Sequence, residues 1–202
     1  MNSLGTIFLF SLAISVSYCG EVITSPPVTN WGDWGVFENC PNGTVVQGFQ
    51  LKTEPYRGAL VDDTALNGVR FYCGHPLSPN ATTITSLVGS WGNWGNIYTC
   101  GLNGSVIGFQ LRVEAFGIVD DETATNNVRF LCSNMAEPNN YIEGDGLGFG
   151  AWRGTVRCGS GEALCGIQTQ IQPDRGALLD DSAMNNLAAE CCPAPASIEY
   201  IY

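Results

Sequence analysis

Hydrophobic and polar residues alternate with a period of two in three separate stretches of the chain. In the first stretch Phe49 and Leu51 fall on one face and Gln50 falls on the other. Two later stretches, 107–113 and 167–172, repeat this alternation. A period of two is typical of half-buried antiparallel strands with one apolar face and one solvated face. No stretch has the apolar stripe of an amphipathic helix, so the pattern predicts an all-β protein.

The three stretches belong to an internal repeat. Each unit opens with an aromatic–glycine motif, found at Trp31–Gly35, Trp91–Gly95 and Phe149–Trp152. A cysteine and the alternating strand follow, and then an acidic turn, an asparagine and a closing cysteine. Successive asparagines in this series are 59 residues apart: Asn67, Asn126 and Asn185. A register kept over three copies indicates one structural unit used three times.

About 59 residues hold roughly four strands at ordinary strand lengths, and one such sheet could hardly bury a core alone. We therefore expect three four-stranded sheets around a pseudo-threefold axis, in a single domain over 21–202. The predicted units run over about 22–80, 81–138 and 139–192, and a short tail, 193–202, follows them.

The amino terminus predicts secretion. Residues 1–20 include the apolar run Ile7–Val16, which has the length of a signal-peptide core and is too short to span a bilayer. No later segment is long and apolar enough to span one. Three sequons make their asparagines candidates for glycosylation: Asn42, Asn80 and Asn103.

The number of cysteines also indicates an extracellular protein. One of the nine, Cys19, lies within the expected signal peptide, and an even number in a secreted chain predicts a disulfide framework. The repeat favours these pairs: Cys40–Cys73, Cys100–Cys132, Cys158–Cys191 and Cys165–Cys192. The sequence leaves open the alternative pairs Cys158–Cys192 and Cys165–Cys191.

The charge balance restricts the partners. Acidic residues outnumber basic ones 19 to 8, which gives a formal net charge of −11. Nucleic acids and anionic membranes are themselves polyanions, so neither is expected to bind. A basic secreted protein is a more suitable partner.

The motifs resemble those of the vitelline membrane outer layer protein family. The resemblance rests on Trp31–Trp34, Gly48–Glu54 and Asp62–Cys73, and it extends from Trp31 to Cys192. It implies a β-prism, in which three Greek-key sheets of four strands surround a pseudo-threefold axis. It also implies an egg-envelope component that associates with ovomucin and lysozyme, and that has been linked to transfer chemistry on N-acetylglucosamine oligomers. The third unit departs from the pattern, because Ala188 stands where Arg70 and Arg129 stand in the other two.

The acidic turns supply the candidate binding residues. They are Asp62, Asp63, Asn67, Asp121, Glu122, Asn126, Asp180, Asp181 and Asn185. Around a threefold axis these residues would gather at equivalent positions, where they could bind sugar hydroxyls or Ca²⁺. The competing interpretation is that they form Asx and Ser/Thr turns that satisfy the loop backbone.

Other side chains give weaker indications of chemistry. Glu54 and Glu114 could form a carboxylate pair for glycosyl transfer, but their strand parity predicts solvated side chains. The tryptophans of the opening motifs could stack on sugars, and packing is the favoured interpretation. His75 is the only histidine, so neither a catalytic triad nor a histidine-rich zinc site can be built.

We therefore expect a secreted structural or interaction protein of an extracellular coat, without catalytic residues, cofactor or resident metal. Its expected partners are glycoproteins, oligosaccharides or basic secreted proteins. Two alternatives remain: an enzyme acting on N-acetylglucosamine oligomers, and a soluble lectin-like module.

Overall fold

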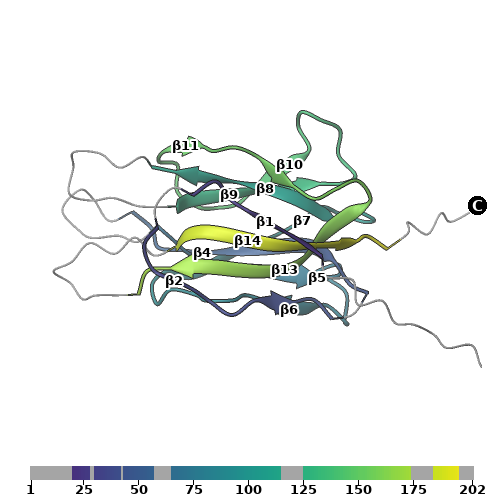
Figure 1. The fold of residues 1–202 in the computed structure, drawn as a ribbon, viewed down its shortest axis with the longest axis horizontal. Helices are drawn as coiled ribbons and strands as arrows, with labels where there is room; N and C mark the ends of the chain where they lie inside the picture. The colour runs from purple at the N-terminus through teal and green to yellow at the C-terminus, as the bar shows by residue number, and fades with distance from the viewer. Residues whose placement is uncertain are drawn as a thin grey trace, which may run out of the picture.

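The computed structural model describes residues 20–27, 30–41, 43–56, 65–114, 125–173 and 184–195. These residues form fourteen strands and no helix (Figure 1). The strands are β1 (Glu21–Thr24), β2 (Asp33–Trp34), β3 (Glu38–Asn39), β4 (Val46–Thr53), β5 (Leu66–Cys73), β6 (Thr82–Ile84), β7 (Asn93–Thr99), β8 (Val106–Val113), β9 (Thr125–Cys132), β10 (Tyr141–Glu143), β11 (Ala151–Trp152), β12 (Val156–Arg157), β13 (Glu162–Ile171) and β14 (Met184–Pro193). The expected signal peptide lies outside the described residues except for Gly20, as do Asn42 and most of the tail.

The strands form three antiparallel sheets. Sheet B has the order β6-β5-β4-β7, and sheet C has the order β10-β9-β8-β11, with β12 also paired to β8. In sheets B and C three consecutive strands form a meander and the fourth returns beside the first, which is the Greek key. The all-β prediction of three Greek-key sheets in a β-prism is confirmed.

Sheet A is assembled from both ends of the chain. Its order is β1-β14-β13-β2, with β3 also paired to β13, so three amino-terminal strands join the carboxyl-terminal hairpin. The sheets are also out of phase with the sequence repeat. Strand β7 belongs to the second predicted unit, 81–138, yet it pairs with β4 of the first.

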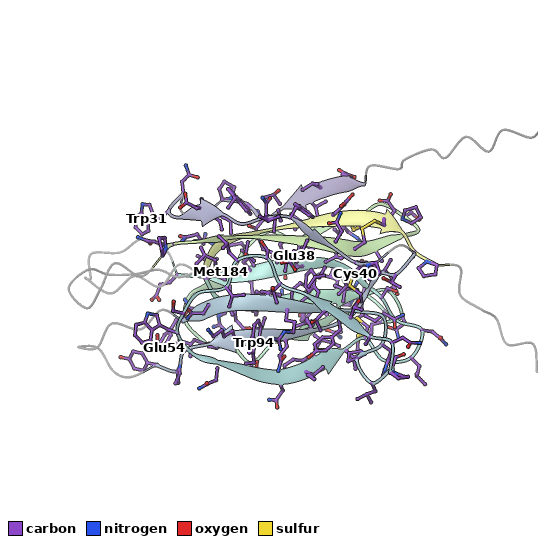
Figure 2. All side chains as sticks on the ribbon, turned by 90° about the horizontal axis from the view of Figure 1, so that it is seen from below. Trp31, Glu38, Cys40, Glu54, Trp94 and Met184 are labelled. Carbon is purple, nitrogen blue, oxygen red and sulfur yellow. A yellow bond between two sulfur atoms is a disulfide. The ribbon has the colours of Figure 1, made fainter. Side chains whose placement is uncertain are left out.

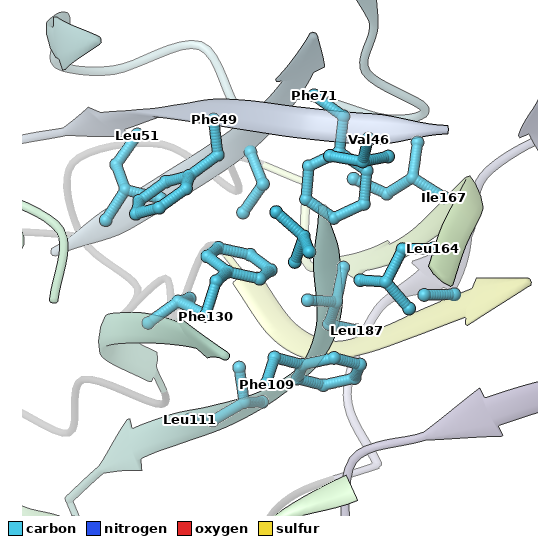
Figure 3. Packing of buried hydrophobic residues seen from close by; sticks show 14 of the residues in the cluster. Val46, Phe49, Leu51, Phe71, Phe109, Leu111, Phe130, Leu164, Ile167 and Leu187 are labelled. Carbon is cyan, nitrogen blue, oxygen red and sulfur yellow. The ribbon is translucent and has the colours of Figure 1, made fainter. Parts of the chain in front are cut away.

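The inner faces of the sheets meet in one aromatic core (Figure 3). Phe130 of sheet C lies 4.5 Å from Phe49 and 5.3 Å from Phe71 of sheet B, measured between ring centroids. Sheet A adds Ile167 and Leu187, which are fully buried. The alternation seen in the sequence therefore supplies three apolar faces to a single interior.

Four disulfides reinforce this arrangement, and their pairs are those that the repeat favours. Cys40 follows β3 of sheet A and binds Cys73 of sheet B. The pair Cys100–Cys132 joins the end of β7 in sheet B to sheet C, and Cys158–Cys191 joins sheet C to sheet A. These three bonds thus connect the sheets in a closed cycle.

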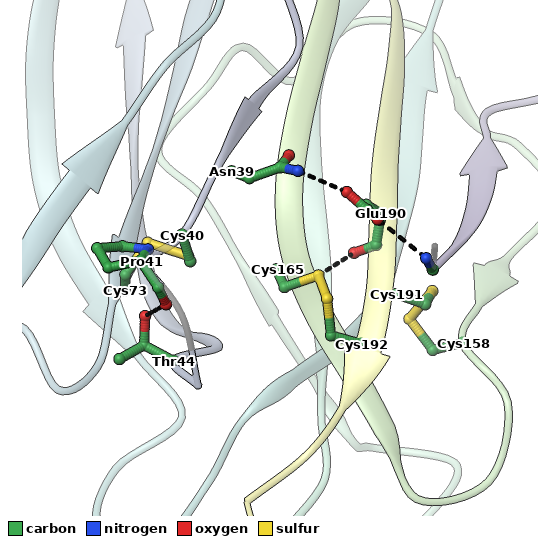
Figure 4. The surroundings of a disulfide bond; sticks show 11 residues. Asn39, Cys40, Pro41, Thr44, Cys73, Cys158, Cys165, Glu190, Cys191 and Cys192 are labelled. Carbon is green, nitrogen blue, oxygen red and sulfur yellow. Dashed lines mark hydrogen bonds between the residues drawn. A yellow bond between two sulfur atoms is a disulfide. The ribbon is translucent and has the colours of Figure 1, made fainter. Parts of the chain in front are cut away.

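The fourth disulfide has a different location. Cys165 and Cys192 lie on β13 and β14, so this bond lies within sheet A (Figure 4). Glu190 beside it accepts hydrogen bonds from the backbone N–H of Gly20 at 3.0 Å and from Asn39 Nδ2 at 2.8 Å. The carboxylate therefore ties the amino-terminal strands to β14.

Candidate functional site

The glycines of the opening motifs fix three tight turns. Gly32, Gly92 and Gly150 have φ angles of 80°, 76° and 75°, which disfavour any residue with a Cβ. A Cβ on Gly92 would lie 2.4 Å from the backbone of Thr53 and 2.5 Å from the backbone nitrogen of Glu54. Each turn therefore packs directly on the end of a central strand from another part of the repeat.

Replacing Gly92 by alanine is expected to lower the free energy of unfolding by about 3 kcal/mol, because backbone strain and a steric overlap combine. Gly101→Ala is the matched control, since Gly101 has a φ of 78° and a Cβ added there would meet nothing within 4 Å. In the control only the backbone strain applies, so its free energy of unfolding should fall by about 1–2 kcal/mol. Chemical denaturation measures both variants, and equal losses would contradict the close approach at Gly92.

These turns place large aromatic side chains at one end of the prism. Trp31 and Glu54 lie at this end (Figure 2), and the Gly92 turn packs on Glu54. The rings of Phe149 and Tyr56 meet edge to face, with centroids 5.2 Å apart. The aromatic residues at the first position of the motif share a high exposure: Trp31 40%, Trp91 45% and Phe149 41%. We call these three residues the aromatic rim.

Burial in the core is therefore the wrong interpretation for Trp31 and Trp91, and for Trp34, which is also 40% exposed, while packing at a corner of the prism stays a prediction. Strand propensity and glycine spacing do not reveal this exposure, because the tight turn directs the ring outward. Trp94 and Trp152 are half-buried.

The expectation that Glu54 is solvated is also wrong. Glu54 is 3% exposed, its backbone N–H donates to the carbonyl of Ala65 at 2.8 Å, and the Gly92 turn lies against its backbone. Glu114 is half-buried, and the equivalent residue of the third unit, Gln172, is 6% exposed. Alternation along a strand cannot predict a covering turn that comes from another repeat.

The predicted acidic cluster falls in segments that are not described. Asp62, Asp63, Asp121, Glu122, Asp180 and Asp181 lie outside the described residues. The asparagines that follow them are described and buried: Asn67, Asn126 and Asn185. Near these asparagines the hydroxyl of Thr125 donates to the backbone carbonyl of Asn185 at 3.2 Å, which connects the starts of β9 and β14.

The outer faces of the sheets carry a polar arrangement that the sequence prediction missed. In sheet B, Gln50 Nε2 donates to the carbonyl of Gly95 at 2.7 Å, and its Oε1 accepts from Arg70 at 3.0 Å. The Arg70 guanidinium in turn lies 3.9 Å from the ring centroid of Trp94. The sequence places the same pair of residues at equivalent positions of two units: Gln50 with Arg70, and Gln110 with Arg129.

Sheet C has the same arrangement. Gln110 Nε2 donates to the carbonyl of Arg153 at 2.9 Å, and its Oε1 accepts from Arg129. The Arg129 guanidinium lies 4.5 Å from the ring centroid of Trp152 and 3.8 Å from that of Tyr141. In both sheets an arginine thus covers the tryptophan and occupies the glutamine oxygen.

The remaining candidate sites are at the surface. Asn80 and Asn103 are exposed, as a glycosylation acceptor must be. Within the described ranges, no three His, Cys, Asp or Glu residues are placed to hold a metal ion. The same ranges contain no helix long and apolar enough to cross a lipid bilayer.

Solved structures with this fold include plant and animal lectins. Calystegia sepium agglutinin superposes with a TM-score of 0.56 at 11% identity, covering 88% of this chain and 99% of its own. A prostate-specific WGA16 glycoprotein lectin gives a TM-score of 0.54 at 11% identity, covering 85% and 99%. At these identities the likeness shows a shared β-prism fold.

Sequence relatives identify the family. The model of vitelline membrane outer layer protein I matches residues 21–194. The mouse vitelline membrane outer layer protein 1 homolog is 43% identical over 172 residues, covering 82% of this chain and 81% of its own. The human homolog is 44% identical over 177 residues, covering 85% and 81%. The chain therefore belongs to the vitelline membrane outer layer protein I family.

Proposed function

We propose that this protein is a secreted component of an extracellular coat, such as an egg envelope or mucous layer, and that it binds the glycans of coat glycoproteins. Family membership supports the coat role. Four disulfides support an extracellular address, because such bonds persist in oxidising compartments.

The aromatic rim is the observation that carries glycan binding. Trp31, Trp91 and Phe149 are held by tight turns, so they lose little conformational freedom when a ligand stacks on them. Large exposed rings on a rigid frame suit the apolar face of a sugar. One structural neighbour, the lectin from Calystegia, was solved in complex with a biantennary N-glycan.

The acidic residues of the predicted turns, which lie outside the described residues, are proposed to add polar contacts to this site. Two described residues that precede these segments, Glu54 and Val113, carry the backbone on which the Gly92 and Gly150 turns pack. Carboxylates there could accept hydrogen bonds from sugar hydroxyls or attract a basic coat protein.

A direct test uses an immobilised mucin in its glycosylated and deglycosylated forms. We expect the wild-type protein to bind the glycosylated form, and the double variant Trp31→Ala/Trp91→Ala to bind it roughly tenfold more weakly. Leu77→Ala is the control, because Leu77 is 85% exposed and does not belong to the rim. Equal binding to both forms of mucin would contradict glycan recognition.

A further inference from the structure

The third outer face differs from the other two at one position, and this difference removes the arginine that covers a tryptophan and donates to a glutamine oxygen in the other two. Ala188 pairs with Gln168 in sheet A, as Arg70 pairs with Gln50 in sheet B and Arg129 with Gln110 in sheet C. An alanine can neither cover a tryptophan nor donate to the glutamine.

Trp34 is the ring that this change leaves open. It pairs with Gln170, which puts its side chain on the outer face together with Gln168 and Ala188. Its equivalents, Trp94 and Trp152, each lie beneath an arginine. Among the described residues no cation covers Trp34, and its side chain is 40% exposed.

Gln168 supplies an oriented hydrogen-bond acceptor beside this ring. Its Nε2 donates to the carbonyl of Gly35 at 2.8 Å, and this bond fixes the amide orientation because a carbonyl can only accept. No described residue donates to its Oε1. In the other sheets the corresponding oxygens accept from Arg70 and Arg129.

The side chain of Gln170, which pairs with Trp34, is held in a fixed position. Gln170 is 4% exposed, its Nε2 donates to the carbonyl of Gly32 at 3.0 Å, and its Oε1 accepts from Asn186 at 2.6 Å. Trp34 therefore pairs with a residue whose side-chain amide is held by hydrogen bonds at both its nitrogen and its oxygen, which is the preorganisation that a ligand site needs.

The charge of sheet A restricts the class of sugar that can bind to it. Its strands contain five acidic residues and no Lys or Arg: Glu21, Asp33, Glu38, Glu162 and Glu190 are the acids. Of these acids, Glu190 shares the outer face with Ala188, while Glu21, Asp33 and Glu38 pair with the inner-face residues Cys191, Ile171 and Ile167. Sulfated or sialylated sugars would therefore be repelled by the net negative charge of the sheet as a whole. A neutral pyranose can place its C–H face on the indole and donate a hydroxyl to Gln168 Oε1.

We propose that the outer face of sheet A, at Trp34 and Gln168 beside the buried Ala188, is a binding site for neutral pyranose sugars. This site is separate from the aromatic rim, and it deepens the proposed function by naming a sugar class. Among the three described outer faces it is present once, because Arg70 and Arg129 close the equivalent positions on sheets B and C.

The test titrates the full chain of the Trp31→Ala/Trp91→Ala variant, in which the aromatic rim no longer contributes, with neutral trisaccharides of glucose, mannose and N-acetylglucosamine, and with 3′-sialyllactose as the anionic probe. Calorimetry gives stoichiometry, and the NMR signal of the Trp34 indole N–H reports contact. We expect one site for at least one neutral sugar, a shift of the Trp34 signal, and at least tenfold weaker binding of the anionic probe. Failure of all neutral sugars to bind would overturn this proposal, while the mucin experiment would still decide the proposed function.

Three variants make the test specific. Trp34→Ala should weaken binding roughly tenfold. Ala188→Arg recreates the cover found in sheets B and C and should abolish binding. In sheet B the hydroxyl of Tyr72 also donates to Gln50 Oε1, at 3.2 Å, so the double variant Arg70→Ala/Tyr72→Phe is needed to open the same arrangement, and the stoichiometry should then rise from one to two. Unchanged binding in both Trp34→Ala and Ala188→Arg would overturn the proposal, and the Arg70→Ala/Tyr72→Phe variant tests the same geometry as a gain rather than a loss.

Discussion

Replacing Phe130 by alanine is expected to lower the free energy of unfolding by about 4 kcal/mol. Phe130 is fully buried and its ring lies within 6.2 Å of the rings of Phe49, Phe71 and Phe109, measured between centroids. Removing it opens a cavity where sheets B and C meet. In a domain of this size the melting temperature should fall by about 8–16 °C.

Ile97→Ala is the matched control for this cavity. Ile97 lies on β7 and is 49% exposed, so its loss should change stability by less than about 0.5 kcal/mol. Differential scanning calorimetry distinguishes the two variants. Similar melting temperatures for Phe130→Ala and Ile97→Ala would show that the core does not centre on Phe130.

Removing the disulfide between Cys40 and Cys73 is expected to cause the second large loss in the free energy of unfolding. The chain-entropy model gives about 3.5 kcal/mol for its sequence separation of 33 residues. Cys73 is 2% exposed and packs in the main core, so the double variant Cys40→Ala/Cys73→Ala should also lose about 1 kcal/mol from the void. The expected total is about 4–5 kcal/mol, measured by urea denaturation.

The bond between Cys165 and Cys192 provides an internal comparison. Its sequence separation is 27 residues, so the entropic contribution is nearly the same, about 3.5 kcal/mol. Cys165 is 3% exposed and packs in a small cluster with Val45 and Ala163, outside the main core, so the void left by Cys165→Ala/Cys192→Ala should cost at most about 1 kcal/mol. A larger loss in this pair than in Cys40–Cys73 would contradict the role assigned to the bonds between sheets.

The fold could be predicted because the same alternation of apolar and polar residues recurs in all three units, although it is a weak signal in any one of them. Alternation at Phe49 and Leu51 indicates an apolar strand face, and its recurrence at Phe109 and Ile167 indicates three such faces that need a common interior. The all-β architecture follows from these residues, while the family resemblance rests on the longer motifs Trp31–Trp34, Gly48–Glu54 and Asp62–Cys73. The split of sheet A between the two ends of the chain is not visible locally, since pairing of β1 with β14 is a long-range event.

The candidate site was harder to predict, for a physical reason. Exposure of Trp31 and burial of Glu54 both depend on a turn that packs on a distant strand, and periodicity within one strand carries no information about it. The substitution at Ala188 was visible in the sequence. Its consequence for Trp34 required the pairing of Gln168 with Ala188 and of Gln170 with Trp34.

The two-ended construction of sheet A sets an order for biosynthesis. Sheets B and C are each encoded by an uninterrupted stretch of chain, so they can assemble while the ribosome is still translating. Strands β1, β2 and β3 are made first, yet their partners β13 and β14 are made last. The nascent protein must therefore keep its earliest strands unpaired until translation is nearly complete, and a truncated product would expose them to aggregation.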